Sequence, residues 1–186
     1  MPRPRTEPPQ PRRDALLAGA IDYVAGHGLA DLSLRPLAAA LGTSARMLVF
    51  HFASKEGLLR ALLAHAHERL QALLRELPPG PGAPLQRFWR HATGSEPMRL
   101  LRILYEAQIL AAQNPPAYAH LRDGDPRAWV RLVAARLPAP FANATGATLV
   151  IAVFDGLMLE RMATGDHRRT TRALDRFTRL LQEASR

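Results

Sequence analysis

The chain has 186 residues, no cysteine and a formal net charge of +9. This length suits one or two small domains with a real core, and the lack of cysteine excludes disulfides and thiolate metal sites. Leucine and alanine dominate, which favours helices over strands. The basic charge suits a polyanion such as nucleic acid. The positive charge is spread over residues 1–60 and 61–186, so it does not locate a binding site. The alternative to a nucleic-acid-binding protein is an ordinary arginine-rich protein.

The first residues, MPRPRTEPPQPRR, are basic and rich in proline, and no apolar segment follows them. This pattern is typical of neither a signal peptide nor a transmembrane helix. We therefore expect residues 1–13 to form a disordered arm, and we expect the protein to be cytoplasmic.

Two helices are predicted directly after the arm. Apolar residues at helical spacing run from Leu16 to Ala25, and the glycines of GHG at 26–28 end this first helix. Ser33 is a suitable N-cap for the second helix, which has a leucine and alanine face and ends at Gly42.

A third, short helix and a long fourth helix follow. Thr43 or Ser44 caps the third helix, which runs to about His51, and Ser54 caps a helix over residues 55–77. Two short helices joined by a glycine-containing turn are the signature of a helix-turn-helix, whose second helix can enter the major groove of DNA. The same arrangement also occurs in α proteins that never touch DNA.

Further helices are predicted beyond PPGPGAP at residues 78–84, which reads as a loop. Their expected ranges are 85–93, 97–113, 126–137, 142–164 and 168–184. The sequence shows no strand-like alternation, so the expected fold class is all-α, with a small N-terminal bundle before a larger helical bundle.

The segment GHGLADLSLRPLAAALGTSARMLVFHFASKEGLL carries a more specific pattern. It resembles the DNA-binding domain of the tetracycline-repressor (TetR) family in its glycine turn, short recognition helix, His-Phe pair and Ser-Lys pair. The resemblance covers residues 14–60, about a quarter of the chain. It implies a three-helix helix-turn-helix DNA-binding domain over residues 14–60 and a C-terminal helical bundle for ligand binding and dimerisation over residues 61–186.

The resemblance also implies which residues contact DNA. The set consists of Ser33, Arg35, Ser44, Ala45, Arg46, Met47, Phe50, His51 and Lys55. Within it, Ser33 and Lys55 match phosphate-binding positions, and residues 45–47 match the start of the recognition helix, where bases are read. Phe50 and His51 match positions at the groove wall and backbone. A lysine suits the start of the fourth helix, because helix N-termini attract phosphate and an ammonium binds a single oxygen well.

Several of these positions allow more than one interpretation. The family commonly has tyrosine at the position of Val49, and valine lacks the hydroxyl that contacts phosphate. Arg46 stands where the family often has a small residue, and it could bond O6 and N7 of guanine or lie along the backbone. His51 could instead interact with helix C-terminal carbonyls. Arg35 matches an arginine that reads a base in some members of the family, and it could instead be solvated surface.

Members of the family bind a small effector among their C-terminal helices. The candidate liners of such a pocket are Trp89, Tyr105, Gln108, Trp129, Phe154 and Met158. Aromatic and methionine residues on helices are also common in cores, so each of them has that alternative. Asp155, Glu106 and Glu160 could hold a cationic group if buried, or could be exposed or paired.

The helices over 142–164 and 168–184 resemble the pair that forms the family's dimer interface. The first of these helices contains TLVIAVFDGLML and is apolar around most of its circumference. Such a helix needs packing partners on two sides. The alternative is a core within one chain.

We therefore expect a homodimeric transcriptional regulator, in the simplest case a repressor that an unknown small-molecule effector releases from a pseudopalindromic double-stranded DNA operator. We expect no enzyme, cofactor, membrane partner or metal site: His65 and His67 lie two residues apart on a helix and point in different directions. One alternative is a helical small-molecule-binding protein or enzyme with an incidental helix-turn-helix. Another is an architectural DNA binder without an effector.

Overall fold

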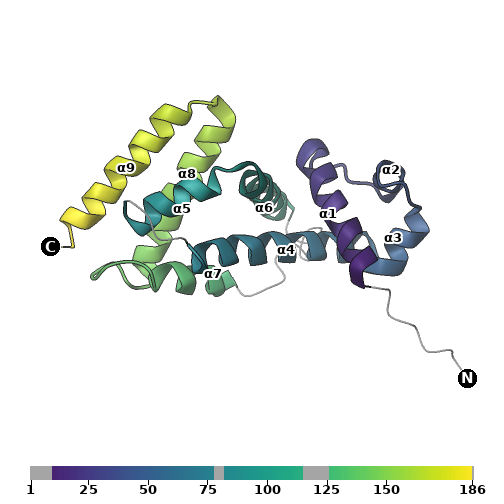
Figure 1. The fold of residues 1–186 in the computed structure, drawn as a ribbon, viewed down its shortest axis with the longest axis horizontal. Coiled ribbons are helices and arrows are strands. Elements are labelled where there is room, and N and C mark those ends of the chain that lie inside the picture. The colour runs from purple at the N-terminus through teal and green to yellow at the C-terminus, as the bar shows by residue number, and fades with distance from the viewer. Residues whose placement is uncertain (1–9, 78–81, 115–125, 186) are drawn as a thin grey trace, which may run out of the picture. The chain divides into compact units, whose positions relative to one another are not determined.

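The computed structural model describes residues 10–77, 82–114 and 126–185, and the regular structure in these ranges is entirely α-helical (Figure 1). The all-α fold class is thereby confirmed. The helices are α1 (Gln10–His27), α2 (Leu34–Ala40), α3 (Ala45–Phe52), α4 (Lys55–Arg75), α5 (Pro84–Ala92), α6 (Ser95–Gln113), α7 (Pro126–Ala134), α8 (Ala144–Thr164) and α9 (His167–Glu183). None of them is both long and apolar enough to span a membrane.

The predicted helices all occur, and they differ from the expectation mainly at their ends. α1 already begins at Gln10, inside the segment expected to be an arm, while residues 1–9 lie outside the described residues. One contact near its start is the Arg13 guanidinium, 5.2 Å from the centre of the Phe52 ring, a cation–π geometry. α7 ends at Ala134, three residues before the predicted end.

The chain divides into two compact units. The first comprises residues 1–70 and 95–124, and so contains α1, α2, α3, most of α4, and α6. The second comprises residues 71–94 and 125–186, with the end of α4 and with α5, α7, α8 and α9. The boundary that we expect after residue 60 is a functional division between DNA binding and ligand binding, and it stays a prediction.

The core of the first unit is formed by the apolar stripes of its helices. Leu16, Ile21 and Val24 of α1 are buried, as their helical spacing predicts. Leu37 of α2 and Leu48 of α3 are also almost fully buried. Burial of these side chains fixes α2 and α3 against α1, since each contributes roughly 1.5–3 kcal/mol by leaving water.

A carboxylate of α6 holds the connection between α1 and α2. Oε1 of Glu106 accepts the backbone N–H of Leu29 at 2.7 Å and that of Ala30 at 3.2 Å. A Cβ at Gly28, where φ is +83°, would lie 2.9 Å from the same oxygen, so glycine permits this approach. Glu106 therefore stabilises the turn that leads into the helix-turn-helix.

The core of the second unit is aromatic. Phe154 of α8 packs against Phe88 and Trp89 of α5, with ring centres 5.2 and 5.5 Å apart. The indole N–H of Trp89 donates to Oγ1 of Thr171 at 3.1 Å, which joins α5 to α9. Leu174 of α9 is fully buried in this unit.

Candidate DNA-binding surface and ligand pocket

The turn between α2 and α3 has the geometry of a helix-turn-helix. Gly42 takes a φ of +60°, a conformation that side chains disfavour. The N–H of Thr43 then donates to the carbonyl of Ala38 at 2.9 Å. Oγ of Ser44 accepts the N–H of Met47 at 3.2 Å, so Ser44 is the side-chain cap of α3.

The recognition helix α3 has two distinct faces. Leu48 and Phe52 are buried, whereas Arg46, Val49 and Phe50 are exposed. These three exposed residues follow the i, i+3, i+4 spacing that places side chains on one helix face. We call them the reading face. Val49 is not among the residues predicted to bind DNA, and its exposure follows from its position three residues after Arg46.

Ala45 and Met47 are partly exposed at the start of α3, beside the exposed cap Ser44. The three residues are therefore at the surface in the same turn as Arg46. Their short or flexible side chains leave Arg46 as the only long cationic group of this turn, so the proposed base contacts depend chiefly on Arg46.

His51 lies on the other face of α3. Only 6% of it is exposed, and neither ring nitrogen has a hydrogen-bond partner among the described residues. Its ring meets Phe50 edge-on at 5.3 Å. A phosphate contact requires the imidazole to turn outward from this position, so the DNA-binding role of His51 stays a prediction.

The start of α2 is open to solvent. Ser33 is its N-cap by backbone geometry, but its side chain makes no capping hydrogen bond. Ser33 and Arg35 are both exposed. Their polar groups are therefore accessible to a phosphate.

Lys55 is the first residue of α4 and is partly exposed. Oγ of Ser54 accepts the N–H of Gly57 at 3.0 Å and caps the helix. A Cβ at Gly57 would lie 1.9 Å from the carbonyl oxygen of Phe52, so glycine is required here. This close approach brings the start of α4 to the end of the recognition helix.

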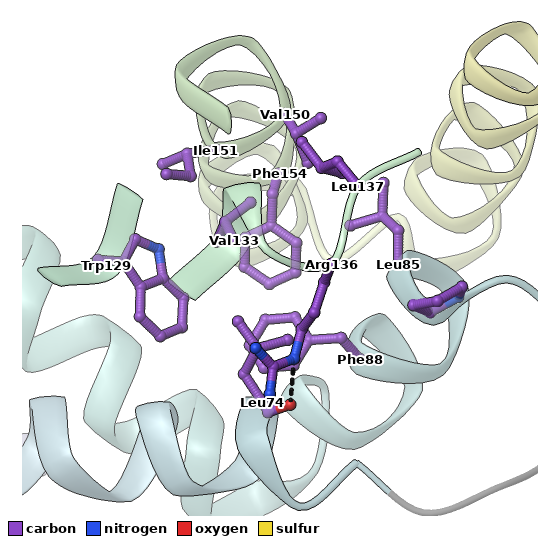
Figure 2. A pocket seen from close by; sticks show the side chains of 11 residues that line it. Leu74, Leu85, Phe88, Trp129, Val133, Arg136, Leu137, Val150, Ile151 and Phe154 are labelled. Carbon is purple, nitrogen blue, oxygen red and sulfur yellow. Dashed lines mark hydrogen bonds between the residues drawn. The ribbon is translucent and has the colours of Figure 1, made fainter. Parts of the chain in front are cut away.

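The second unit contains an apolar pocket with a cavity volume of about 50 Å³ (Figure 2). The end of α4, α5, α7 with the residues after it, and α8 provide its walls. The lining residues are Leu74, Pro84, Leu85, Phe88, Trp129, Val133, Arg136, Leu137, Val150, Ile151 and Phe154. The rings of Phe88 and Trp129 lie 6.1 Å apart within it.

Two of the six predicted liners, Trp129 and Phe154, line this pocket. Trp89 and Met158 are buried in the core of the same unit instead. Tyr105 and Gln108 belong to α6 in the first unit, and Gln108 is exposed. The structure thus does not bring the six together at this pocket.

None of the three acidic residues considered as partners for a cationic ligand lines the pocket. Glu106 binds the N–H groups of Leu29 and Ala30, and Glu160 accepts a hydrogen bond from Arg169. Asp155 is partly exposed on α8. The described lining residues therefore offer no carboxylate.

Arg136 is the charged residue among the described liners, and it is not among the residues predicted from the sequence to line a pocket. Its Nε donates to the carbonyl of Leu74 at 3.0 Å, the bond drawn in Figure 2. Nη1 donates to the carbonyl of Leu132 at 3.1 Å and Nη2 to that of Arg75 at 3.4 Å. The last carbonyls of a helix have no partner within it. Arg136 therefore stabilises the C-terminal turn of α4.

Several apolar side chains of α8 and α9 are exposed to solvent. Leu149, Leu159 and Leu180 are 56%, 42% and 47% exposed, and Val153 and Phe177 are partly exposed. Single exposed leucines are ordinary on a protein surface, whereas a contiguous apolar patch marks a contact with another molecule. No group of three or more His, Asp or Glu side chains suited to a metal ion occurs among the described residues.

Residues 16–62 match the family model of bacterial regulatory proteins, tetR family. A transcriptional regulator of Streptomyces coelicolor is 27% identical, with 91% of this chain and 99% of that chain covered and a TM-score of 0.62. A transcriptional regulator of Rhodococcus sp. Rha1 is 22% identical, with 93% and 97% covered and a TM-score of 0.77, and shows the fold. The multidrug binding protein EbrR, solved with ethidium, is 26% identical, with 89% and 97% covered and a TM-score of 0.63. No curated protein matches.

Proposed function

We propose that the chain is a DNA-binding transcriptional regulator of the TetR family, and that it is a homodimeric repressor released from its operator by a small molecule. The observation that carries the proposal is the match of residues 16–62 together with the solvent-exposed reading face of α3. A helix-turn-helix needs both a rigid turn and an exposed recognition helix to reach base edges.

In the proposed complex, α3 enters the major groove and its N-terminal turn reads bases. Arg46 bonds O6 and N7 of a guanine through its forked N–H groups, and Val49 and Phe50 pack on sugar or thymine methyl groups. Ser33 and Lys55, at the N-termini of α2 and α4, bind phosphates. These phosphate contacts fix the register of the recognition helix.

A dimer is proposed because one recognition helix reads few base pairs. Two helices held at a fixed distance read two half-sites, and a twofold protein then recognises a pseudopalindrome. The exposed leucines of α8 and α9 are the candidate self-complementary surface. Dimeric assembly through α8 and α9 matches the arrangement expected from the family.

The effector is proposed to bind in the apolar pocket of the second unit. EbrR, which binds ethidium, supports a ligand-binding role for a protein of this fold. A ligand can lower DNA affinity only by binding the two conformations with different affinity. We place the protein in the cytoplasm, where operator DNA is accessible, and we assign it no catalytic role.

Selection of bound sequences from a random DNA pool tests this proposal. The full chain is expected to enrich a palindrome with half-sites about one helical turn apart, in agreement with paired recognition helices. Failure to enrich any sequence would favour a helical ligand-binding protein with an incidental helix-turn-helix. Enrichment of a single half-site would contradict the dimer.

A further inference from the structure

We propose that the pocket of the second unit binds a small apolar carboxylic acid, and that Arg136 is the residue that holds its carboxylate. This inference rests on the proposed function, because it names the chemical class of the effector.

The walls require an apolar ligand body. Apart from Arg136 and the indole of Trp129, the described side chains that line the pocket carry no polar atom. A ligand that buries polar groups against such walls loses hydrogen bonds to water without replacement. The rings of Phe88, Trp129 and Phe154 favour an aromatic ligand, because offset and edge-on ring pairs add to the burial energy.

The charge of the walls favours an anion over a cation. Arg136 is the only charged residue among the described liners. A cationic ligand would lose hydration beside a guanidinium and would find no described carboxylate as a partner. The pocket therefore differs in chemistry from one that would suit a cation such as the ethidium bound by EbrR.

Arg136 has donors left for a ligand. A guanidinium carries five N–H groups, and the described residues accept three hydrogen bonds from it, all at neutral backbone carbonyls. A carboxylate forms shorter and stronger bonds with a guanidinium than a carbonyl does. In a partly buried position the attraction between opposite charges is also less screened by water.

Through Arg136, a bound ligand also affects α4. The same guanidinium binds the carbonyls of Leu74 and Arg75, the last residues of α4. A carboxylate that binds the remaining N–H groups draws the guanidinium toward the ligand, which alters its bonds to these carbonyls and so the C-terminal turn of the helix that begins at Lys55. The ligand thereby acts on the helix whose first residue is assigned to a phosphate.

The cavity volume limits the size of the acid. About 50 Å³ is roughly a third of the volume of an engineered apolar cavity that binds benzene, about 150 Å³. Side chains must move even for one ring. The ligand is therefore an acid with a single ring or a short chain.

The test uses benzoate, benzamide and benzamidine, which share one ring and differ in charge. Each is titrated into the full chain while tryptophan emission is recorded, since Trp129 lines the pocket. Benzoate is expected to bind at least ten times more tightly than benzamide, and benzamidine is expected to give no saturable signal. Hexanoate, titrated in parallel, separates chain acids from ring acids: saturation by either acid supports the proposal.

Variants show whether Arg136 is responsible. Arg136→Gln should weaken benzoate binding at least tenfold, to the level of benzamide, and leave benzamide binding unchanged. Arg131→Gln is the matched control, because Arg131 is an exposed arginine of α7 that does not line the pocket. If Arg136→Gln fails to fold, Ile151→Trp fills the pocket with Arg136 in place and should abolish the benzoate signal.

Equal affinities for the three ring compounds, tighter binding of benzamidine, or an equal loss in Arg131→Gln would overturn the inference. An absence of binding by benzoate and hexanoate would overturn it as well, and a palindrome in the DNA selection would then leave the proposed function standing. Benzoate binding without any enriched DNA sequence would instead contradict the proposed function and support the pocket assignment.

Discussion

Lys55 and Arg46 are the two cationic side chains on which the DNA-binding proposal depends most. Lys55 is the only lysine of the chain and the first residue of α4. Arg46 is exposed in the first turn of α3, beside the cap Ser44. Phosphate contacts hold the protein on any sequence, whereas base contacts discriminate between sequences. The two residues should therefore differ in what their removal does.

Lys55→Ala should weaken binding to all DNA sequences about equally, because it removes one phosphate contact from each protomer. The slope of log affinity against log salt should become shallower by about one per protomer. Fluorescence anisotropy over a series of salt concentrations measures both effects. Arg75→Ala removes a positive charge from the other end of α4 and should leave the slope unchanged. An unaltered slope in Lys55→Ala would refute the phosphate assignment.

Arg46→Ala should relax the base preference at one position of each half-site. A bidentate contact with guanine discriminates by about 1–3 kcal/mol, so the variant should lose that amount against the preferred site and little against other sites. Repeating the sequence selection with the variant measures this. A uniform loss of affinity with the preferred sequence intact would show that Arg46 contacts only the backbone.

Among the helices, two ends differ in their effect on the stability of the folded protein. Ala53 follows α3 with a φ of +68°, a conformation that L-residues rarely adopt. Asp166 caps α9, with Oδ1 2.9 Å from the backbone nitrogen of Arg169. The C-terminal end of α3 is therefore strained, whereas the N-terminal end of α9 is stabilised by a charged group.

Ala53→Gly should stabilise the protein, because glycine adopts this conformation without a Cβ clash. The gain should be about 0.5–1 kcal/mol, since the greater freedom of glycine in the unfolded chain offsets part of the relief. Urea unfolding followed by circular dichroism measures it. Ala64→Gly, at an exposed position inside α4, is the matched control and should instead cost about 1 kcal/mol. A destabilised Ala53→Gly variant would contradict the strain at this turn.

Asp166 should make α9 sensitive to acid. The N–H of Arg169, and then the Arg169 guanidinium, hold the pKa of Asp166 below its ordinary value. A carboxyl group with a lowered folded pKa contributes stability above its unfolded pKa and loses it as the pH falls through the folded pKa. Asp166→Asn should therefore lose less unfolding free energy than the parent chain between neutral pH and pH values below the ordinary aspartate pKa. Urea unfolding at several pH values tests this, and identical pH profiles would contradict it.

For the whole molecule, the decisive quantity is the oligomeric state. The exposed leucines of α8 and α9 are available to a second copy, whereas Leu174 on the same helix as Leu180 is fully buried. Substitutions at these two leucines of α9 therefore distinguish the effect of a change in the dimer interface from that of a change in the core. Val153 and Phe177 are only partly exposed, so substitutions there would distinguish interface from core less clearly.

Leu180→Arg should give a folded monomer with unchanged helicity and much weaker operator binding. A charge near the twofold axis meets its own copy, and neither charge is solvated in a dry interface. Leu174→Arg should instead unfold the protein, because it buries an unpaired charge. Sedimentation and circular dichroism distinguish the two results. An unmutated chain that sediments as a 20.5 kDa monomer at micromolar concentration would contradict the dimer.

The helices and the helix-turn-helix were predictable from the sequence because the forces that form them act over a few residues. Caps such as Ser44 and turn glycines such as Gly42 act within one turn of the chain. The reading face also follows from helical spacing once α3 is located. The burial of His51 did not follow, because the exposure of a helix face depends on how that helix packs within its unit.

The set of residues that line the pocket is determined by the tertiary structure. Leu74, Trp129 and Val150 lie on three different helices and meet only because those helices pack together. Arg136 binds the carbonyl of Leu74, 62 residues earlier in the chain. Helix geometry determines contacts between residues three or four apart, whereas contacts over such distances depend on how helices cross. The sequence by itself therefore determined the helices and the DNA-binding motif, and the packing of the helices decided which side chains line the pocket.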